Sequence, residues 1–115
     1  MIAHVVLFRL QPEVSFADRR TLIDTWATAL KEIPSIRRAR IGRRIRVGRS
    51  YEQLTRLDFP YAAILEFDDV AGLHAYLDHP AHEAMAARLF AAIADTLIYD
   101  FEVMAEAEEL DRLSR

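Results

Sequence analysis

The chain has 115 residues, a length typical of a single domain, and hydrophobic residues make up 52% of it, which is enough for one packed core. It contains no cysteine, which excludes disulfide bonds, thiolate nucleophiles and thiolate metal sites. No apolar run has the length of a membrane span, and residues 1–9 lack the basic start and the cleavage site of a signal peptide. We therefore expect one cytoplasmic domain without membrane contact.

Charge is distributed unevenly along the chain. The formal net charge is −3, but residues 1–57 hold 12 basic and 5 acidic side chains, whereas residues 58–115 hold 3 and 13. Halves of opposite sign predict ion pairs within the fold or across a dimer interface. The arginine-rich segment 37–49 is the one feature that would favour a polyanionic partner. A strand with solvated arginines on one face explains it more simply, and we predict no nucleic-acid partner.

Residues 2–10 form an apolar run rich in β-branched and aromatic side chains, which predicts a strand. Both faces of this strand are apolar, so each side of the sheet needs a cover. One face holds Ile2, His4, Val6, Phe8 and Leu10, and the other holds Ala3, Val5 and Leu7. His4 is therefore either a hydrogen-bonded core histidine or a polar group in a pocket.

The next elements are a helix and two strands. Ser15 and Asp18 resemble a capping box, and apolar residues then follow helical spacing up to Pro34. These apolar positions are Leu22, Ile23, Trp26, Ala27, Leu30 and Ile33. Residues 36–47 predict a long basic strand, residues 48–56 a polar connection that we expect to be mobile, and residues 61–67 a central strand.

Residues 69–83 predict a helix, a break and the start of a second helix. Pro80 disfavours the helical conformation of His79, so the helix that begins near Val70 ends near Asp78, and Pro80 opens the next one. His82 then lies in the first turn, where the helix dipole favours the neutral imidazole that acid–base chemistry near pH 7 requires. The alternative is that both histidines are surface residues at a helix junction.

The last part of the predicted domain is a third helix and a fourth strand. The helix has inward positions at Met85, Leu89, Ala92 and Ile93, widened by Ala86, Phe90 and Ala94. Residues 97–104 predict a strand with Tyr99, Phe101 and Val103 on one face and Ile98, Asp100 and Glu102 on the other. The order βαββαβ predicts a ferredoxin-like α+β fold, in which the helices cover one face of a four-stranded antiparallel sheet. Residues 105–115 form an acidic C-terminal tail, expected to be disordered or a frayed helix.

Three segments together resemble the stress-responsive dimeric α/β-barrel (Dabb) domain family over residues 1–104. They are His4–Leu10 near the start, Ile33–Ile36 at the end of the first helix, and Ala75–His82 at the proline junction. The resemblance implies that two subunits pack their uncovered sheet faces together as a dimeric α+β barrel. That arrangement would supply the second cover that the first strand needs.

The resemblance also implies candidate site residues. In polyketide cyclases of this family the catalytic histidine falls on His82, the pocket tyrosine on Tyr76 and the first-strand histidine on His4. Their other pocket histidine aligns with Ala62 or Ala63 here, which is a departure from the pattern. The three candidate residues are expected to share one small apolar pocket per subunit, between the sheet and the helices, with Trp26, Phe8 and Leu89. The pocket is expected to bind a small hydrophobic or aromatic molecule.

Three functions remain open at this point. The first is a homodimeric ligand-binding Dabb protein without an assigned activity. The second is a cofactor-free polyketide cyclase or lyase with His82 as general base and Tyr76 as hydrogen-bond donor. The third is a cofactor-independent monooxygenase. No metal and no cofactor are predicted, because His4, His79 and His82 match no spacing of a metal motif.

Overall fold

The computed structural model describes residues 1–104 and 107–114 and has the predicted ferredoxin-like fold. Its four strands form one antiparallel sheet in the order β2-β3-β1-β4. The helices and strands are β1 (Ile2–Leu10), α1 (Phe16–Glu32), β2 (Arg38–Arg43), β3 (Tyr61–Phe67), α2 (Val70–Leu77), α3 (Pro80–Ala92) and β4 (Ile93–Glu102). Two short 3₁₀ helices, η1 (Ser50–Gln53) and η2 (Ala107–Ser114), complete the described elements. None of the helices in these residues is long and apolar enough to cross a membrane.

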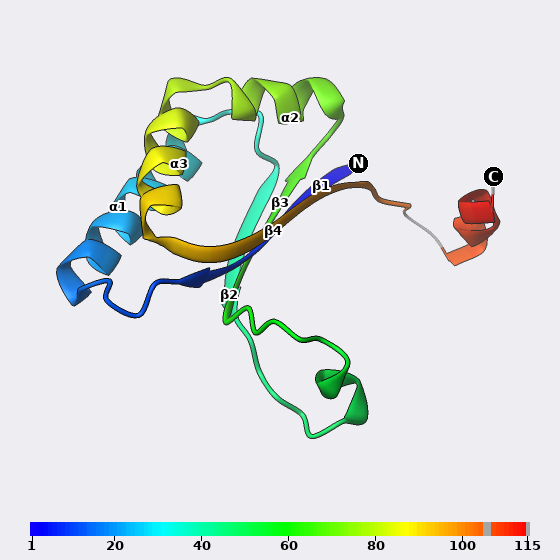
Figure 1. Ribbon diagram of the computed structural model, residues 1–115. Helices are drawn as coiled ribbons and strands as arrows, with labels where there is room; N and C mark the ends of the chain where they lie inside the picture. The colour runs from blue at the N-terminus through cyan, green and yellow to red at the C-terminus, as the bar shows by residue number, and fades with distance from the viewer. Residues whose placement is uncertain (105–106, 115) are drawn as a thin grey trace.

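All three α-helices lie on the same side of the sheet, and the other side carries none of them (Figure 1). The core fills the space between the helices and the sheet, and Phe67 and Leu65 are its largest fully buried side chains. The predicted alternation of β1 is confirmed, since His4, Val6 and Phe8 face the helices and are buried. The two central strands therefore anchor the helical layer.

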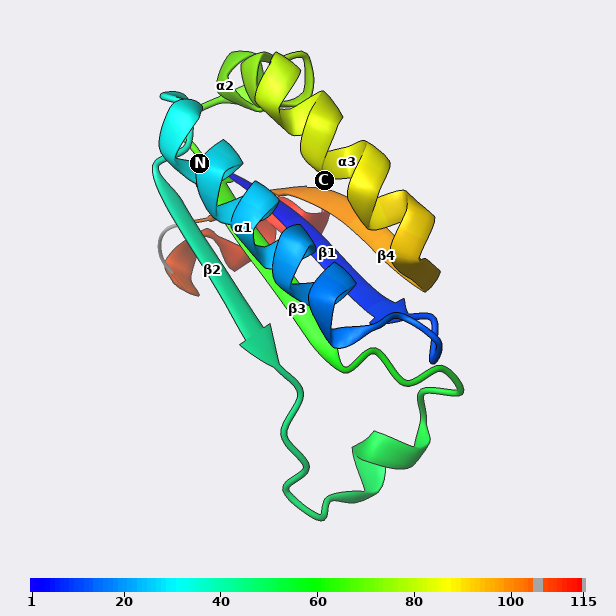
Figure 2. The ribbon, with the colours of Figure 1, turned by 90° about the vertical axis from the view of Figure 1, so that its left-hand side faces the viewer.

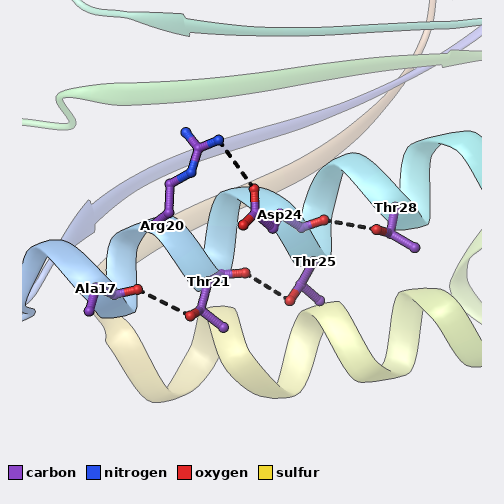
Figure 3. Close-up of polar contacts among 6 residues, drawn as sticks. All are labelled: Ala17, Arg20, Thr21, Asp24, Thr25 and Thr28. Carbon is purple, nitrogen blue, oxygen red and sulfur yellow. Dashed lines mark hydrogen bonds and ion pairs between the residues drawn. The ribbon is translucent and has the colours of Figure 1, made fainter.

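Helix α1 has hydrogen bonds at its start and along its polar face, and its apolar face packs into the core. Ser15 caps its start by accepting a hydrogen bond from the backbone N–H of Asp18 at 3.1 Å, as the sequence predicts. Three threonines donate their hydroxyls to carbonyls one turn earlier, which satisfies these hydroxyls within the helix (Figure 3). The inward positions Leu22 and Trp26 are buried, whereas Ile23, predicted on the same stripe, is 54% exposed.

The uncovered side of the sheet carries an apolar patch, flanked by Arg40 and by the Arg9–Asp95 and Arg38–Glu66 pairs. We call this patch the open face, and its residues are Val5, Leu7, Ala62, Ile64, Leu97, Tyr99 and Phe101. Tyr99 and Phe101 are more than half exposed, and their rings lie 6.1 Å apart in a tilted contact. Among the residues that the structure describes, none of the α-helices covers the second face of β1.

Strand β2 is shorter than predicted. The sequence indicated a strand over 36–47, but pairing with β3 covers only Arg38–Arg43. Beyond this the Arg44 N–H donates to the Pro60 carbonyl at 2.8 Å, and proline offers no N–H in return. The ladder stops there because its partner strand begins only at Tyr61.

The connection from β2 to β3 projects from the end of the sheet and contains η1 (Figures 1 and 2). The Glu52 carboxylate accepts the backbone N–H groups of Val47, Gly48 and Arg49 at 2.8–3.1 Å. These hydrogen bonds, that of Val47 first, lower the pKa of Glu52. Gly48 takes φ +77°, a conformation that favours glycine. The segment predicted as a mobile connection is thus a loop with its own internal hydrogen bonds.

Strand β4 begins earlier than predicted. Ile93 and Ala94, assigned to the third helix by their spacing, are strand residues. The reason is a contact distant in sequence, since Gln11 donates its backbone N–H to Ala92 and its side-chain amide to Ile93. These two hydrogen bonds lie where α3 ends, and β4 begins at the next residue without a loop. The predicted faces of the strand are confirmed, with Ile98 and Asp100 on the helix side. Of the predicted tail, residues 105–106 and 115 lie outside the described residues.

Ion pairs join the basic and acidic halves of the chain, which confirms the predicted pairing within the fold. Arg9 pairs with Asp95, and Asp58 accepts both Arg44 at 2.6 Å and Arg46 at 3.6 Å. Two more pairs connect the start of β2 to the end of β3. Arg38 of β2 pairs with Glu66 of β3 at 4.0 Å, and Arg37 just before β2 pairs with Asp68 just after β3 at 2.6 Å. Much of the arginine-rich segment is therefore paired inside the molecule.

Candidate functional site

Three of the predicted site residues meet under α2 and α3. Tyr76 from α2 lies between His4 from β1 and His82 from α3, with ring centroids 5.7 and 4.5 Å away and both contacts edge-on. Phe67 packs on Tyr76 at 5.3 Å and closes the cluster from the sheet. We call His4, Tyr76, His82 and the adjoining Asp100 the His–Tyr cluster.

The proline junction places His82 as the sequence predicts. Helix α2 ends at Leu77, and Pro80 is the first residue of α3. His79 caps α3 by accepting the backbone N–H of Ala81 on its Nδ1 at 3.0 Å. His79 is therefore a structural residue of the junction, and its neighbour His82 points back at the end of α2.

His82 is held in one tautomer. Its Nδ1 lies 3.1 Å from the Leu77 carbonyl oxygen, and because a carbonyl only accepts, Nδ1 carries the hydrogen and donates it. Burial lowers the pKa of His82, and the nearby His4 lowers it further, while the Leu77 carbonyl and Glu83 oppose this change. The imidazole is thus biased to the neutral form, in which Nε2 has a free lone pair for a proton.

Tyr76 supplies a hydroxyl that stays protonated. Its side chain is 2% exposed, and this burial raises the pKa of Tyr76 to about 12. At neutral pH it can act as a hydrogen-bond donor beside the His82 ring. A neutral imidazole next to a neutral phenol is an arrangement suited to proton transfer.

Asp100 is a member of the cluster that sequence reasoning missed. The Nδ1 of the buried His4 lies 2.6 Å from a carboxylate oxygen of Asp100, which fixes the orientation of the imidazole. The alternation of the last strand predicted Asp100 on the face opposite Tyr99 and Phe101, and the structure shows that this is the helix side. What the sequence did not give was the register, in which His4 and Asp100 are direct partners. No group of three or more His, Asp or Glu side chains that could hold a metal ion was found among the described residues.

A separate cavity lies between α1 and the β2 side of the sheet. We call it the α1–β2 groove, and it has a volume of about 490 Å³. Its lining is Phe8, Leu10, Arg19, Leu22, Ile23, Trp26, Ala27, Leu30, Ile41, Gly42, Arg43 and Tyr61. Phe8 stacks on Tyr61 at 5.4 Å and contacts Trp26 at 5.6 Å, so the floor is aromatic. This volume and lining are typical of small-molecule sites.

The structure separates residues that the sequence assigned to one pocket. Phe8 and Trp26 line the α1–β2 groove, whereas His4, Tyr76 and His82 line none of the three cavities described. The other two cavities lie on the open face beside the β2–β3 loop and between α1 and α3. Leu89 is buried in the core of α3 and lines none of the three.

A four-stranded antiparallel sheet with helices on one face and a bare apolar second face defines a small ferredoxin-like α+β protein. A family model, the stress responsive A/B barrel domain (Dabb), matches residues 2–103. The chain belongs to this family.

Solved structures agree with this assignment. The protein At3g17210 from Arabidopsis thaliana has 18% identity and a TM-score of 0.76, with 93% of this chain and 99% of that chain covered. A dimeric ferredoxin-like protein of unknown function from Thermobifida fusca has 25% identity, a TM-score of 0.70 and coverages of 89% and 90%. A hydroxynitrile lyase from Passiflora edulis has 19% identity, a TM-score of 0.75 and coverages of 91% and 94%. The comparison with curated proteins found no match.

His82 should make the stability of the protein depend on pH. Because burial first of all lowers its pKa in the folded state, the unfolded chain binds the proton more readily. The free energy of unfolding should therefore decrease as the pH falls below the ordinary histidine pKa of about 6.5. The decrease should continue until the pH passes the folded-state value. Denaturant unfolding of the wild type and of His82→Gln between about pH 5 and pH 8 measures this, and a variant with the wild-type slope would contradict it.

Proposed function

We propose that the chain forms a cytoplasmic homodimer that binds a small hydrophobic or aromatic molecule in the α1–β2 groove of each subunit. The observation that carries the proposal is the groove itself, whose walls are apolar side chains from α1 and β2 over an aromatic floor. Ile23 and Ile41 stay about half exposed on these walls. In this proposal residues 1–104 form the functional domain and residues 105–115 an appended tail.

The open face supports the dimer. It presents a continuous apolar surface over β3, β1 and β4, and the dimeric relative from Thermobifida fusca has the same fold. Packing two such faces together about a two-fold axis would remove this surface from water. It would also supply the second cover that β1 lacks in the single chain.

Leu7→Arg should split the proposed dimer. Leu7 lies on the open face opposite Leu97, so an arginine there would place an unpaired charge in the interface. Sedimentation at micromolar concentration should give a dimer for the wild type and a monomer for the variant. Ala87→Arg, on the exposed side of α3, is the control and should stay dimeric. A wild-type protein that sediments as a monomer would overturn the dimer.

Ligand binding can be followed through Trp26, the single tryptophan of the chain. A panel of phenolic and β-dicarbonyl compounds should change its emission, because Trp26 lines the groove. Ile41→Gln should weaken binding by roughly tenfold, since it places a polar side chain in the apolar wall. The matched control is Ile45→Gln, which is 78% exposed and does not line the groove. Calorimetry that finds no binding for any compound would reject the proposed ligand site.

The second candidate function is acid–base catalysis at the His–Tyr cluster. It is favoured by one observation, the fixed tautomer of His82, which leaves Nε2 unprotonated while the imidazole contacts the ring of Tyr76. In a cyclase or lyase reaction His82 would take a proton from the substrate and Tyr76 would donate to the oxygen that gains charge. One protein of the same fold, from Passiflora edulis, is a hydroxynitrile lyase, which supports this candidate. The cluster ranks second because none of the described cavities opens onto it.

Two substitutions separate catalysis from a structural role of His82. If the cluster is catalytic, His82→Ala should lower turnover of an aromatic hydroxynitrile or a linear polyketone by about 10²–10⁴-fold. Tyr76→Phe should cost less, since only one hydrogen-bond donor is lost. If His82 only clamps the junction through Leu77, His82→Ala should lower the melting temperature, and no substrate should be turned over by either protein. Initial rates and thermal unfolding measured on the same preparations decide between the two.

A further inference from the structure

Two arginines line one end of the α1–β2 groove. Arg19 lies in the first turn of α1 and Arg43 is the last residue of β2, and both line the cavity. The start of α1 and the end of β2 lie at the same end of the sheet (Figure 2). From there the groove follows α1 to Leu30, a distance of about 16 Å by the rise of the helix.

The side chains of Arg19 and Arg43 have no ion pair and no hydrogen bond to any residue that the structure describes. Their sequence neighbours differ in this respect. Arg20 pairs with Asp24 at 3.6 Å, and Arg44 pairs with Asp58 at 2.6 Å. The positive charges of Arg19 and Arg43 are thus not compensated by an ion pair with any described residue. The rest of the lining is apolar apart from the tyrosine and the tryptophan.

We propose that the groove selects an amphipathic carboxylate, with the apolar body along α1 and the carboxylate between Arg19 and Arg43. This inference rests on the proposed ligand site and adds the chemical class of its ligand. The guanidinium group is a planar fork of N–H donors that matches the two oxygens of a carboxylate. Ile41 and Leu30 line the groove beyond the arginines, so an aliphatic or aromatic tail would contact only apolar walls there.

Octanoate and 1-octanol are suitable probes because they share a tail length and differ in charge. Titration calorimetry, with Trp26 emission as a second readout, should give about tenfold tighter binding for octanoate. Added salt should weaken octanoate binding and leave 1-octanol binding unchanged, because salt screens exposed charges. Arg43→Gln and Arg19→Gln should each lower the affinity for octanoate by about tenfold and leave that for 1-octanol unchanged.

Arg20→Gln is the matched control, since it removes the same charge from the same helix outside the groove lining. If octanoate and 1-octanol bind equally well, the carboxylate preference is overturned while the apolar ligand site stands. If octanoate binds tightly but neither groove arginine affects it, the anion is held elsewhere and the inference is wrong. If both probes and the phenolic and β-dicarbonyl panel fail to bind, the ligand site and the inference fall together.

Discussion

The structure depends on a strand that is apolar on both faces while helices cover only one. On the helix side Val6 and Phe8 of β1 pack into the core, and this packing positions α1 and α3 over the sheet. On the other side Leu7 and its neighbours form the open face. An isolated chain leaves that surface to water, which is unfavourable in proportion to the apolar area exposed. The same strand therefore organises the core of one subunit and the surface on which the proposed dimer depends.

Where local chemistry dictates the structure, the sequence was sufficient. Ser15 caps α1 and Pro80 begins α3, because each residue acts on backbone groups within three positions of itself. Element boundaries that depend on distant residues were missed. The end of β2 is set by Pro60 and the start of β4 by Gln11, and neither contact can be seen in the periodicity of the segment it limits.

The charges of the chain, too, were predictable in part: their pairing followed from the sequence, but the choice of partners did not. The opposite signs of its two halves predicted pairing, and the pairs from Arg9 to Asp95 and from Arg44 to Asp58 confirm it. Composition does not say which arginines remain without a partner, because that depends on which acidic side chains the sheet register brings near. Arg43 faces the helix side of β2, whereas Arg40 three residues earlier faces the open side. Of these two arginines, only Arg43 therefore places its charge at the groove.

The sequence predicted one pocket, and the structure divides its residues between the His–Tyr cluster and the α1–β2 groove. Alternation along β1 correctly placed His4 and Phe8 on one face, which suggested a single pocket that also included Trp26. Val6 lies between His4 and Phe8 on that face and is buried. His4 and Phe8 are about 13 Å apart along the strand. Periodicity gives the face of a residue, but the partners it meets along the strand come from helices elsewhere in the chain. Because packed core separates the His–Tyr cluster from the groove, a ligand in the groove would not touch His82. The two proposed functions therefore depend on separate sets of residues, and a substitution that abolishes one should leave the other intact.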